Sequence, residues 1–231
     1  MKIGISGAMD MEVSTLKKDA KISKVEKKAH MEFFEGELGG QPVVIVRSGI
    51  GKVNAAVCAQ ILADDFHVTH IINTGAAGSL AGELDIEDVV ISTEAVEHDF
   101  DVSRIGFKKG EHPYINIVNF PASEELRKKA LQAVRAVAPD IRAVEGRICT
   151  GDQFISSGEK KEELIREFGG SCAEMEGGAI AHACYLNQIP FVIIRSMSDK
   201  ADDSSHMSFD EFAEKAAARG AAVVKYMLEH W

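Results

Sequence analysis

The sequence predicts a single α/β domain, and three observations support this prediction. Short apolar runs of strand length recur along the 231 residues, and most are followed by a stretch with helical periodicity. The chain is long enough to bury one sizeable core. No repeat, low-complexity tract or Pro/Ser-rich linker divides it. We therefore expect one domain over residues 1–231.

The expected strands and helices of the first half alternate along the chain. In order they are a strand at Lys2–Ser6, a helix from Met9, a β-hairpin or meander within 22–47 with the turn Gly39-Gly40, a helix at Val53–Ala63, and strands at His70–Thr74 and Asp88–Ile91. The small residues that follow Thr74 suggest that another group comes close to the backbone there.

The second half opens with an unusually long loop. Residues 103–121 exceed the usual length of a connection, and such loops tend to be lids or interfaces. The elements expected after it are a helix at Ser123–Val137, a strand at Val144–Cys149, a surface helix at Glu159–Phe168, an alanine-rich helix from Gly177, a strand at Phe191–Ile194, and a last helix from the capping box Ser208-Phe209-Asp210-Glu211 to about Leu228.

Ionisable residues gather around the strand at Phe191–Ile194. The charged and polar residues that flank it and the alanine-rich helix are Glu174, Glu176, Arg195, Ser198 and Asp199. The carboxyl end of such a strand is where open α/β sheets bind ligands, and buried charges are costly unless they are paired or functional. Taken singly, Glu174 could be a solvated turn residue and Asp199 a loop cap. Together the five residues predict a functional site.

Two other stretches could contribute to this site. Glu12 lies in the first turn of a helix, although an acid there also complements the helix dipole, which explains Asp10 equally well. The segment S-G-I-G-K resembles a phosphate loop, but Val46 and Val53 break the Walker pattern, and Asn54 replaces the third glycine of a dinucleotide fingerprint. We expect this loop to let the backbone approach a ligand or another strand.

The composition disfavours several classes of protein. A net charge of -10, one Trp and three Tyr do not suit a nucleic-acid-binding surface. The eight histidines form no H-E-x-x-H or similar motif, and the acidic stretch Glu97–Asp101 lacks a recognisable ligand spacing. We therefore expect no metal and no cofactor.

The sequence also predicts a soluble cytoplasmic protein. Cys58, Cys149, Cys172 and Cys184 are spread through apolar surroundings without a C-x-x-C pair, which indicates buried free thiols. The first apolar run is too short for a signal peptide, and no run approaches the roughly 18 residues of a membrane span.

Seven segments resemble the nucleoside phosphorylase/hydrolase family. In chain order they are M-K-I-G-I-S-G-A-M, S-G-I-G-K-V, I-N-T-G-A-A-G, G-D-Q-F-I, A-E-M-E, R-S-M-S-D and S-F-D-E-F. Each segment alone is a weak signal, but their number, order and spacing are specific. The resemblance implies a three-layer α/β/α sandwich with a central mixed β-sheet. It also implies hydrolysis of 5′-methylthioadenosine, S-adenosylhomocysteine and 5′-deoxyadenosine with release of adenine, a role in methionine salvage, and a homodimer.

The resemblance further implies roles for individual residues. Asp199 would protonate nitrogen-7 of adenine, and Glu12 would deprotonate the attacking water. Glu176 would bind the ribose hydroxyls, and Met175 would lie beneath the sugar. Phe154 would stack on adenine, and Ile155 would contact the base edge through its backbone. Ser198 and Arg195 would support Asp199 and the water site. The residues expected around the 5′ group are Met9, Ile50, Val102 and Phe209, and those expected in a neighbouring subunit's pocket are Phe107 and Pro113. Ala76 stands where the family often has a serine, so one hydroxyl contact near the water and sugar is missing.

The chemistry of the reaction explains why carboxyl groups are needed. Breaking an N-glycosidic bond builds positive charge on the ribose and negative charge on the departing purine. An acid at the base neutralises the second charge, and carboxylates near the sugar favour the first. Asp199 must therefore carry a proton while Glu12 is ionised, and different surroundings separate such roles.

Several alternatives stay open at this stage. A phosphorylase would need cationic groups near the sugar, and the segment G-A-M-D-M-E supplies acids and no arginine. A hydrolase for a futalosine-type nucleoside with a bulkier 5′ group differs in pocket depth, which the sequence does not reveal. A nucleoside-binding protein without activity would be expected to lack Glu12 or Asp199, and both are present. An α/β domain of unrelated role is the remaining alternative.

Overall fold

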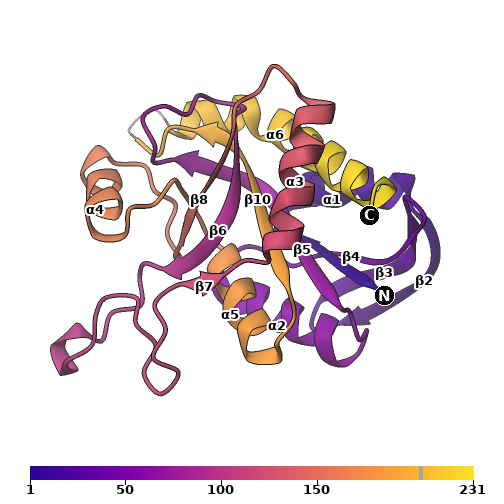
Figure 1. Cartoon of the computed structure of the whole chain (residues 1–231), viewed down its shortest axis with the longest axis horizontal. Helices are drawn as coiled ribbons and strands as arrows, with labels where there is room; N and C mark the ends of the chain where they lie inside the picture. Colours follow the sequence, from indigo (N-terminus) through magenta and orange to yellow (C-terminus); the bar gives the residue numbers. More distant parts are fainter. Residues whose placement is uncertain (203–204) are drawn as a thin grey trace.

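A mixed β-sheet forms the centre of the molecule, with helices on both faces (Figure 1). The computed structural model describes residues 1–202 and 205–231, and only the backbone of 205–208, 210 and 211. The strands in this part of the chain are β1 (Ile3–Gly7), β2 (Lys21–Lys28), β3 (Met31–Leu38), β4 (Gln41–Arg47), β5 (His70–Ser79), β6 (Val89–Glu97), β7 (Phe120–Pro121), β8 (Ala143–Thr150), β9 (Cys172–Glu174) and β10 (Phe191–Asp199). The helices are α1 (Asp10–Asp19), α2 (Lys52–Asp64), η1 (Ser103–Ile105), α3 (Glu124–Val137), α4 (Gly158–Phe168), α5 (Gly177–Asn187) and α6 (Ser205–Glu229).

Part of the sheet closes into a ring. β1 lies parallel between β4 and β5, and β10 is parallel to β5 but antiparallel to β6. β6, β8 and β9 run parallel to one another, and β9 returns to β5 as an antiparallel partner. The central mixed sheet is therefore confirmed, and β5, β10, β6, β8 and β9 form a closed cycle that the sequence did not indicate.

The helices cover the sheet in two groups. α1, α3 and α6 pack on one face, and α2 and α5 pack on the other (Figure 1). Along β10, Val192 and Ile194 join the first core, whereas Phe191 and Ile193 join the second, because successive strand residues point to opposite faces. The three-layer arrangement is confirmed. A strand buried on both faces has a continuous apolar sequence, which made this one easy to predict.

The hairpin expected around Gly39-Gly40 is present. Leu38 pairs with Gln41 across the turn, and the two glycines have φ angles of 57° and 78°. Positive φ at both central residues suits the twist of a two-residue hairpin, and glycine adopts it without steric cost.

Several strands extend further than predicted. β5 continues through the small residues after Thr74 to Ser79, and β10 continues through Arg195 and Ser198 to Asp199. The physical reason is the closed cycle: β10 pairs with β5 as far as Gly78, so these residues have partners that a simple open sheet would not supply. Arg195 and Ser198 therefore lie within the strand rather than after it.

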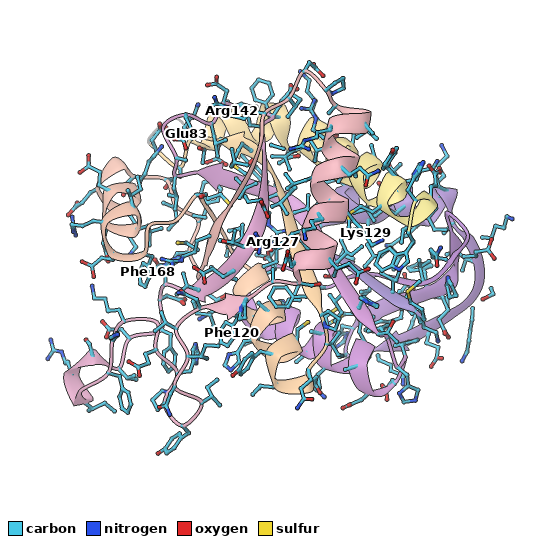
Figure 2. All side chains as sticks on the ribbon, in the orientation of Figure 1. Glu83, Phe120, Arg127, Lys129, Arg142 and Phe168 are labelled. Atoms are coloured by element: carbon cyan, nitrogen blue, oxygen red, sulfur yellow. The ribbon has the colours of Figure 1, made fainter. Side chains whose placement is uncertain are left out.

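Side chains also fix the connections at one end of the sheet. Figure 2 shows Glu83 and Arg142 close together, where Arg142 Nη1 donates to the backbone oxygen of Glu83 at 2.8 Å. Arg127 of α3 donates through Nε to Glu145 Oε1 of β8 at 2.7 Å. These contacts join the β5–β6 connection and α3 to the strand β8.

The long loop and the last helix agree with the predictions in outline. The segment 98–119 leaves the sheet and projects away from it, with η1 at its tip (Figure 1). α6 begins at Ser205, three residues before the expected start at Ser208, and the side chains of the predicted capping box lie outside the described residues except for Phe209. Among the helices in the described residues, none is both long and apolar enough to cross a bilayer.

Candidate active site

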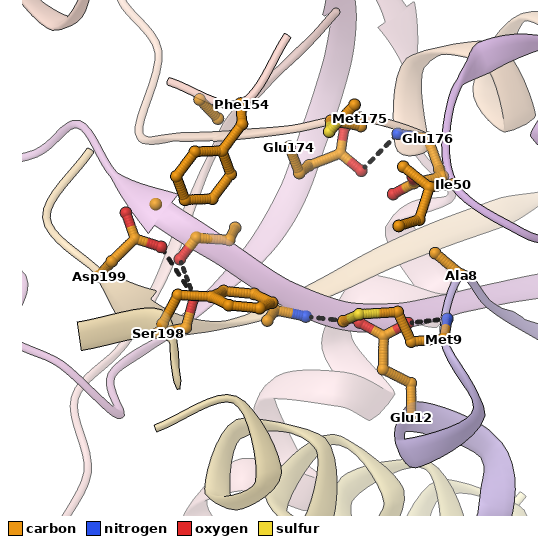
Figure 3. Close-up of a pocket in the computed structure, with 15 residues that line it drawn as sticks. Ala8, Met9, Glu12, Ile50, Phe154, Glu174, Met175, Glu176, Ser198 and Asp199 are labelled. Atoms are coloured by element: carbon orange, nitrogen blue, oxygen red, sulfur yellow. Dashed lines mark hydrogen bonds between the residues drawn. The ribbon is translucent and has the colours of Figure 1, made fainter. Parts of the chain in front are cut away.

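A cavity of about 490 Å³ lies beside the carboxyl-terminal halves of β5 and β10 (Figure 3). It collects residues from stretches that are far apart in the sequence. The predicted site residues that line it are Met9, Glu12, Ile50, Ala76, Phe154, Met175, Glu176, Ser198, Asp199 and Phe209. The sheet topology brings them together, because the ends of β1, β5, β9 and β10 and the loop before α2 meet at this point.

Glu12 is buried at one side of the cavity and is held by backbone groups. Its Oε2 accepts a hydrogen bond from Met9 N at 2.9 Å, and its Oε1 accepts one from Ala76 N at 3.0 Å. The first bond is half of a capping box at the start of α1. Because Ala76 contributes its backbone N–H, this contact does not depend on the serine hydroxyl that the chain lacks.

A glycine makes room for the Glu12 carboxyl. A Cβ at Gly75 would lie 2.5 Å from Glu12 Oε1, closer than any side chain tolerates. Similarly, a Cβ at Gly78 would lie 2.7 Å from Asp199 Oδ1. The two glycines of the G-A-A-G segment thus provide the space for the two carboxyl groups. The close approach that the small residues suggested is confirmed.

Asp199 ends β10 at the opposite side of the cavity, near Phe154 (Figure 3). It is only 2% exposed. Its Oδ2 accepts a hydrogen bond from Ser198 Oγ at 2.9 Å, and its Oδ1 accepts one from Ala201 N at 2.8 Å. Ser198 therefore contacts Asp199 directly.

Glu174, in the cavity wall, forms a buried ion pair with Arg195 behind it. Arg195 Nη2 donates to Glu174 and also to Asn73 Oδ1, the latter at 2.5 Å. Glu174 Oε2 further accepts from the backbone N of Glu176 and Gly177, at 3.1 and 2.7 Å, which satisfies the start of α5. An arginine can be buried without a large penalty only when it has such partners.

Glu176 has fewer partners than Glu174. Its Oε1 accepts a hydrogen bond from Gly51 N at 2.8 Å, so the glycine loop before α2 does bring its backbone to the site. Burial raises the pKa of Glu176 to about 8, and the neighbouring Glu174 acts in the same direction. Burial also raises the pKa of Glu12, against the opposing effects of Arg195 and of the backbone hydrogen bonds.

The remaining walls are apolar. Phe154 and Phe209 meet edge to face, with ring centroids 5.9 Å apart. Met175 lies between Phe154 and Glu176, and Met9 and Ile50 lie toward the Glu12 side (Figure 3). The cavity is thus lined by aromatic side chains beside Asp199, by carboxyl groups in its middle, and by aliphatic side chains on the Glu12 side.

The chain matches a known protein family. The family model described as the phosphorylase superfamily matches residues 2–229. The chain belongs to this superfamily. The 5′-methylthioadenosine/S-adenosylhomocysteine nucleosidase of an Exiguobacterium species is 40% identical over 228 residues, which cover 97% of this chain and 96% of that protein. The resemblance inferred from the seven segments is confirmed.

Solved structures give the same result. The nucleosidase of the same name from Neisseria meningitidis, in complex with methylthio-immucillin-A, matches with a TM-score of 0.95 and 37% identity over 100% of this chain and 99% of that chain. The futalosine hydrolase of Helicobacter pylori matches with a TM-score of 0.94 and 33% identity, over 100% of this chain and 98% of that one. All three relatives are named as nucleosidases or hydrolases, the enzyme class that the sequence predicts.

Five predicted site residues do not line the cavity of this chain. Arg195 lies behind the wall, and Ile155 is buried in a small core with Leu164 and Phe168. The other three, which are Val102, Phe107 and Pro113, lie on the projecting segment 98–119. The expectation that Val102 helps to line the pocket around the 5′ group is therefore not met within a single chain.

Some residues at the site were not predicted from the sequence. Glu174 was noticed but received no role, and Asn73 was overlooked as an arginine partner. Their signal is weak, because only the folded sheet brings both to Arg195. Ala8, Ala77, Gly78 and Ala173 complete the lining. A group of metal-binding character, Glu97, His112 and His182, lies outside this cavity.

Proposed function

We propose that this enzyme hydrolyses the N-glycosidic bond of 5′-methylthioadenosine and S-adenosylhomocysteine, releasing adenine and the 5′-substituted ribose. 5′-Deoxyadenosine would fit the same cavity. One observation carries the proposal. Among the described residues that line the cavity, four carry carboxyl groups and none is Lys, Arg or His. Such a wall suits a cationic ribose and a neutral nucleophile, and the names of the relatives support the substrates.

Asp199 is the proposed acid. A protonated Asp199 would donate to nitrogen-7 of adenine as the electrons of the glycosidic bond move into the purine. Ser198 Oγ and Ala201 N already point at its two oxygens, so they stabilise the carboxylate that remains. Phe154 lies beside it and would stack on the base.

Glu12 is the proposed base. A water between Glu12 and the anomeric carbon would attack that carbon and pass its proton to the carboxylate. The raised pKa of Glu12 makes it a better proton acceptor than an exposed glutamate, and its two backbone hydrogen bonds fix its direction.

Glu176 is the proposed partner of the ribose hydroxyls. The pKa of about 8 means that its ionised form is disfavoured in the free site. Positive charge that builds on the ribose favours this ionised form, so the interaction strengthens toward the transition state. Met175 would pack beneath the sugar beside it.

The sugar product tests the proposal against a phosphorylase. We expect incubation with 5′-methylthioadenosine and excess phosphate to yield free 5-methylthioribose, identified by mass spectrometry. A sugar 1-phosphate would contradict hydrolysis. It would require an anion site that the acidic cavity wall does not offer.

A futalosine-type substrate is the second candidate, because the Helicobacter pylori futalosine hydrolase has the same fold at 33% identity. The aliphatic side of the cavity, with Met9 and Ile50, favours a thioether over a bulky polar 5′ group. A higher kcat/KM for the futalosine-type nucleoside than for 5′-methylthioadenosine would reverse this preference.

We also propose that two copies of the chain form a homodimer. The outer face of α2 and α5 exposes Val53 (74%), Val57 (39%) and Leu186 (59%), which is unusual for helices that pack in a core. Ile50, at the cavity mouth, is 56% exposed and continues this face. The projecting segment 98–119 would then carry Val102, Phe107 and Pro113 to the partner's cavity.

The proposed setting is the cytoplasm. All four cysteines are free thiols in the structure, which is usual in a reducing compartment. Release of adenine from the two thioether nucleosides would serve methionine salvage and clear a product of methyl transfer.

A further inference from the structure

We propose that Glu97, His112 and His182 form a zinc-binding site, distinct from the active-site cavity. Glu97 ends β6, His112 lies on the projecting segment, and His182 lies on α5. One donor atom from each residue lies within 4.8 Å of the other two. Two imidazoles and a carboxylate are a donor set that Zn²⁺ prefers.

The distances between donors suit a single ion. Glu97 Oε1 lies 3.1 Å from His182 Nδ1 and 3.8 Å from His112 Nε2. Donors around a tetrahedral Zn²⁺ lie about 3.3 Å apart, given metal–ligand distances of about 2.0–2.2 Å. Small ring rotations would therefore complete the coordination.

His112 supplies the observation that points to a ligand. Its side chain is 9% exposed, and its Nε2 is buried without a hydrogen-bond partner among the described residues. An unpartnered buried nitrogen is unfavourable, and this one faces the Glu97 carboxylate at a distance too long for a hydrogen bond. A bound cation between the two groups would satisfy both.

Aromatic neighbours hold the two imidazoles in place. His112 stacks on Phe100 with centroids 4.2 Å apart, and His182 stacks on Phe120 with centroids 4.5 Å apart. Phe120 lies next to α5 at the base of the projecting segment (Figure 2). The His112 and His182 rings are themselves 4.4 Å apart and steeply inclined. Such packing orients the donors before a metal arrives.

The charges around Glu97, His112 and His182 are compatible with a bound cation. Lys52 Nζ contacts Glu97 Oε2 at 3.1 Å, but it also pairs with Asp99 at 2.6 Å, so Asp99 offsets its charge. Glu97 and Asp99 thus place two carboxylates beside a single ammonium group.

Glu97 and His182 line a second cavity of about 470 Å³ between α2 and α5, on the face that the proposed homodimer would cover. Three protein ligands leave a fourth zinc position, which a water in this cavity would fill. A bound ion would join the projecting segment to the sheet and to α5, and so restrain the segment.

Zinc binding by the chelator-treated protein tests the proposal. We expect titration with ZnCl₂ to show one tight equivalent per chain by calorimetry. This equivalent should be lost in His112→Phe, which keeps the ring stack, and in His182→Gln, which keeps a donor to Glu97. His30→Asn is the control, because His30 is exposed and its φ of 62° suits asparagine.

A second measurement follows the projecting segment. Zn²⁺ should slow tryptic cleavage after Lys108 and Lys109 in the wild type and in His30→Asn, but not in His112→Phe. Retention of the tight equivalent in either His112→Phe or His182→Gln would overturn the site. So would its loss in His30→Asn, or the absence of saturable binding by the wild type.

Discussion

Glu174 and Glu176 are two residues apart, but they differ in the number of hydrogen-bond donors around their carboxyl groups. Glu174 accepts hydrogen bonds from Arg195, Thr150 and two backbone N–H groups, whereas Glu176 accepts one, from Gly51. A carboxylate with many donors is stabilised, and a buried one with a single donor beside another carboxylate is not. The pKa of Glu176 near 8 follows from this contrast.

The stability of the protein should reflect this raised pKa. The folded state holds the Glu176 proton more tightly than the unfolded chain does. The resulting stability is complete below pH 4.5 and is lost as the pH rises through about 8. We expect the free energy of unfolding of Glu176→Gln to rise relative to the wild type across this window, because glutamine does not ionise. Urea unfolding at several pH values measures it, and a pH-independent difference would contradict the assignment.

The acid role of Asp199 makes a separate prediction. Asp199→Asn should lower kcat by roughly 10²–10⁴, the range typical of general acid–base catalysis. The fold should persist, because the asparagine Oδ1 can accept from Ala201 N and its Nδ2 can donate to Ser198 Oγ. Asp140→Asn, at an exposed turn, is the matched control. Wild-type turnover in Asp199→Asn, with circular dichroism unchanged, would remove Asp199 from the mechanism.

At the level of secondary structure, β5 determines the geometry of the site. Its small residues place a backbone N–H on Glu12 and leave space for both carboxyl groups. A side chain there would displace them, and misplacement by about 1 Å can cost roughly 10²-fold in rate.

Gly75→Ala tests this reading of β5. The new Cβ would lie 2.5 Å from Glu12 Oε1, so we expect kcat/KM to fall by about 10²-fold. Gly82→Ala is the control, because a Cβ at Gly82 meets nothing within 4 Å. Equal activity in the two variants would show that β5 does not need its small residues.

The elements could be predicted wherever local patterns determine them. The Gly39-Gly40 turn and the helix after Ser123 follow from turn chemistry and capping, and both are present. The ends of β5 and β10 were placed too early, because partner strands from distant sequence extend them. Glu97, His112 and His182 were not recognised as a group, because they are far apart in the sequence and only the fold brings them together.

For the whole molecule, the main prediction concerns assembly. Val53 is 74% exposed on the apolar face of α2, so Val53→Glu should leave the fold intact and prevent dimer formation. We expect light scattering to give half the wild-type mass, and activity to fall if the partner completes the cavity. Val25→Glu, on the exposed surface of β2, is the control and should remain dimeric. A wild type that is already monomeric would contradict the proposed dimer.

The overall architecture and most of the cavity were predictable from the seven segments, since most of them contain a strand end or the loop that follows it. The closed cycle of strands was not, because it depends on pairings between β5, β9 and β10 that leave no local pattern. Val102, Phe107 and Pro113 lie outside the cavity of the single chain, and only the proposed dimer would bring them to a cavity.

Release of adenine from 5′-methylthioadenosine, with and without phosphate, tests the central claim most directly when wild type and Glu12→Gln are compared. The proposed mechanism predicts a wild-type rate that does not depend on phosphate and falls by roughly 10²–10⁴ in Glu12→Gln. Release that requires phosphate, or an unchanged rate in Glu12→Gln, would contradict it.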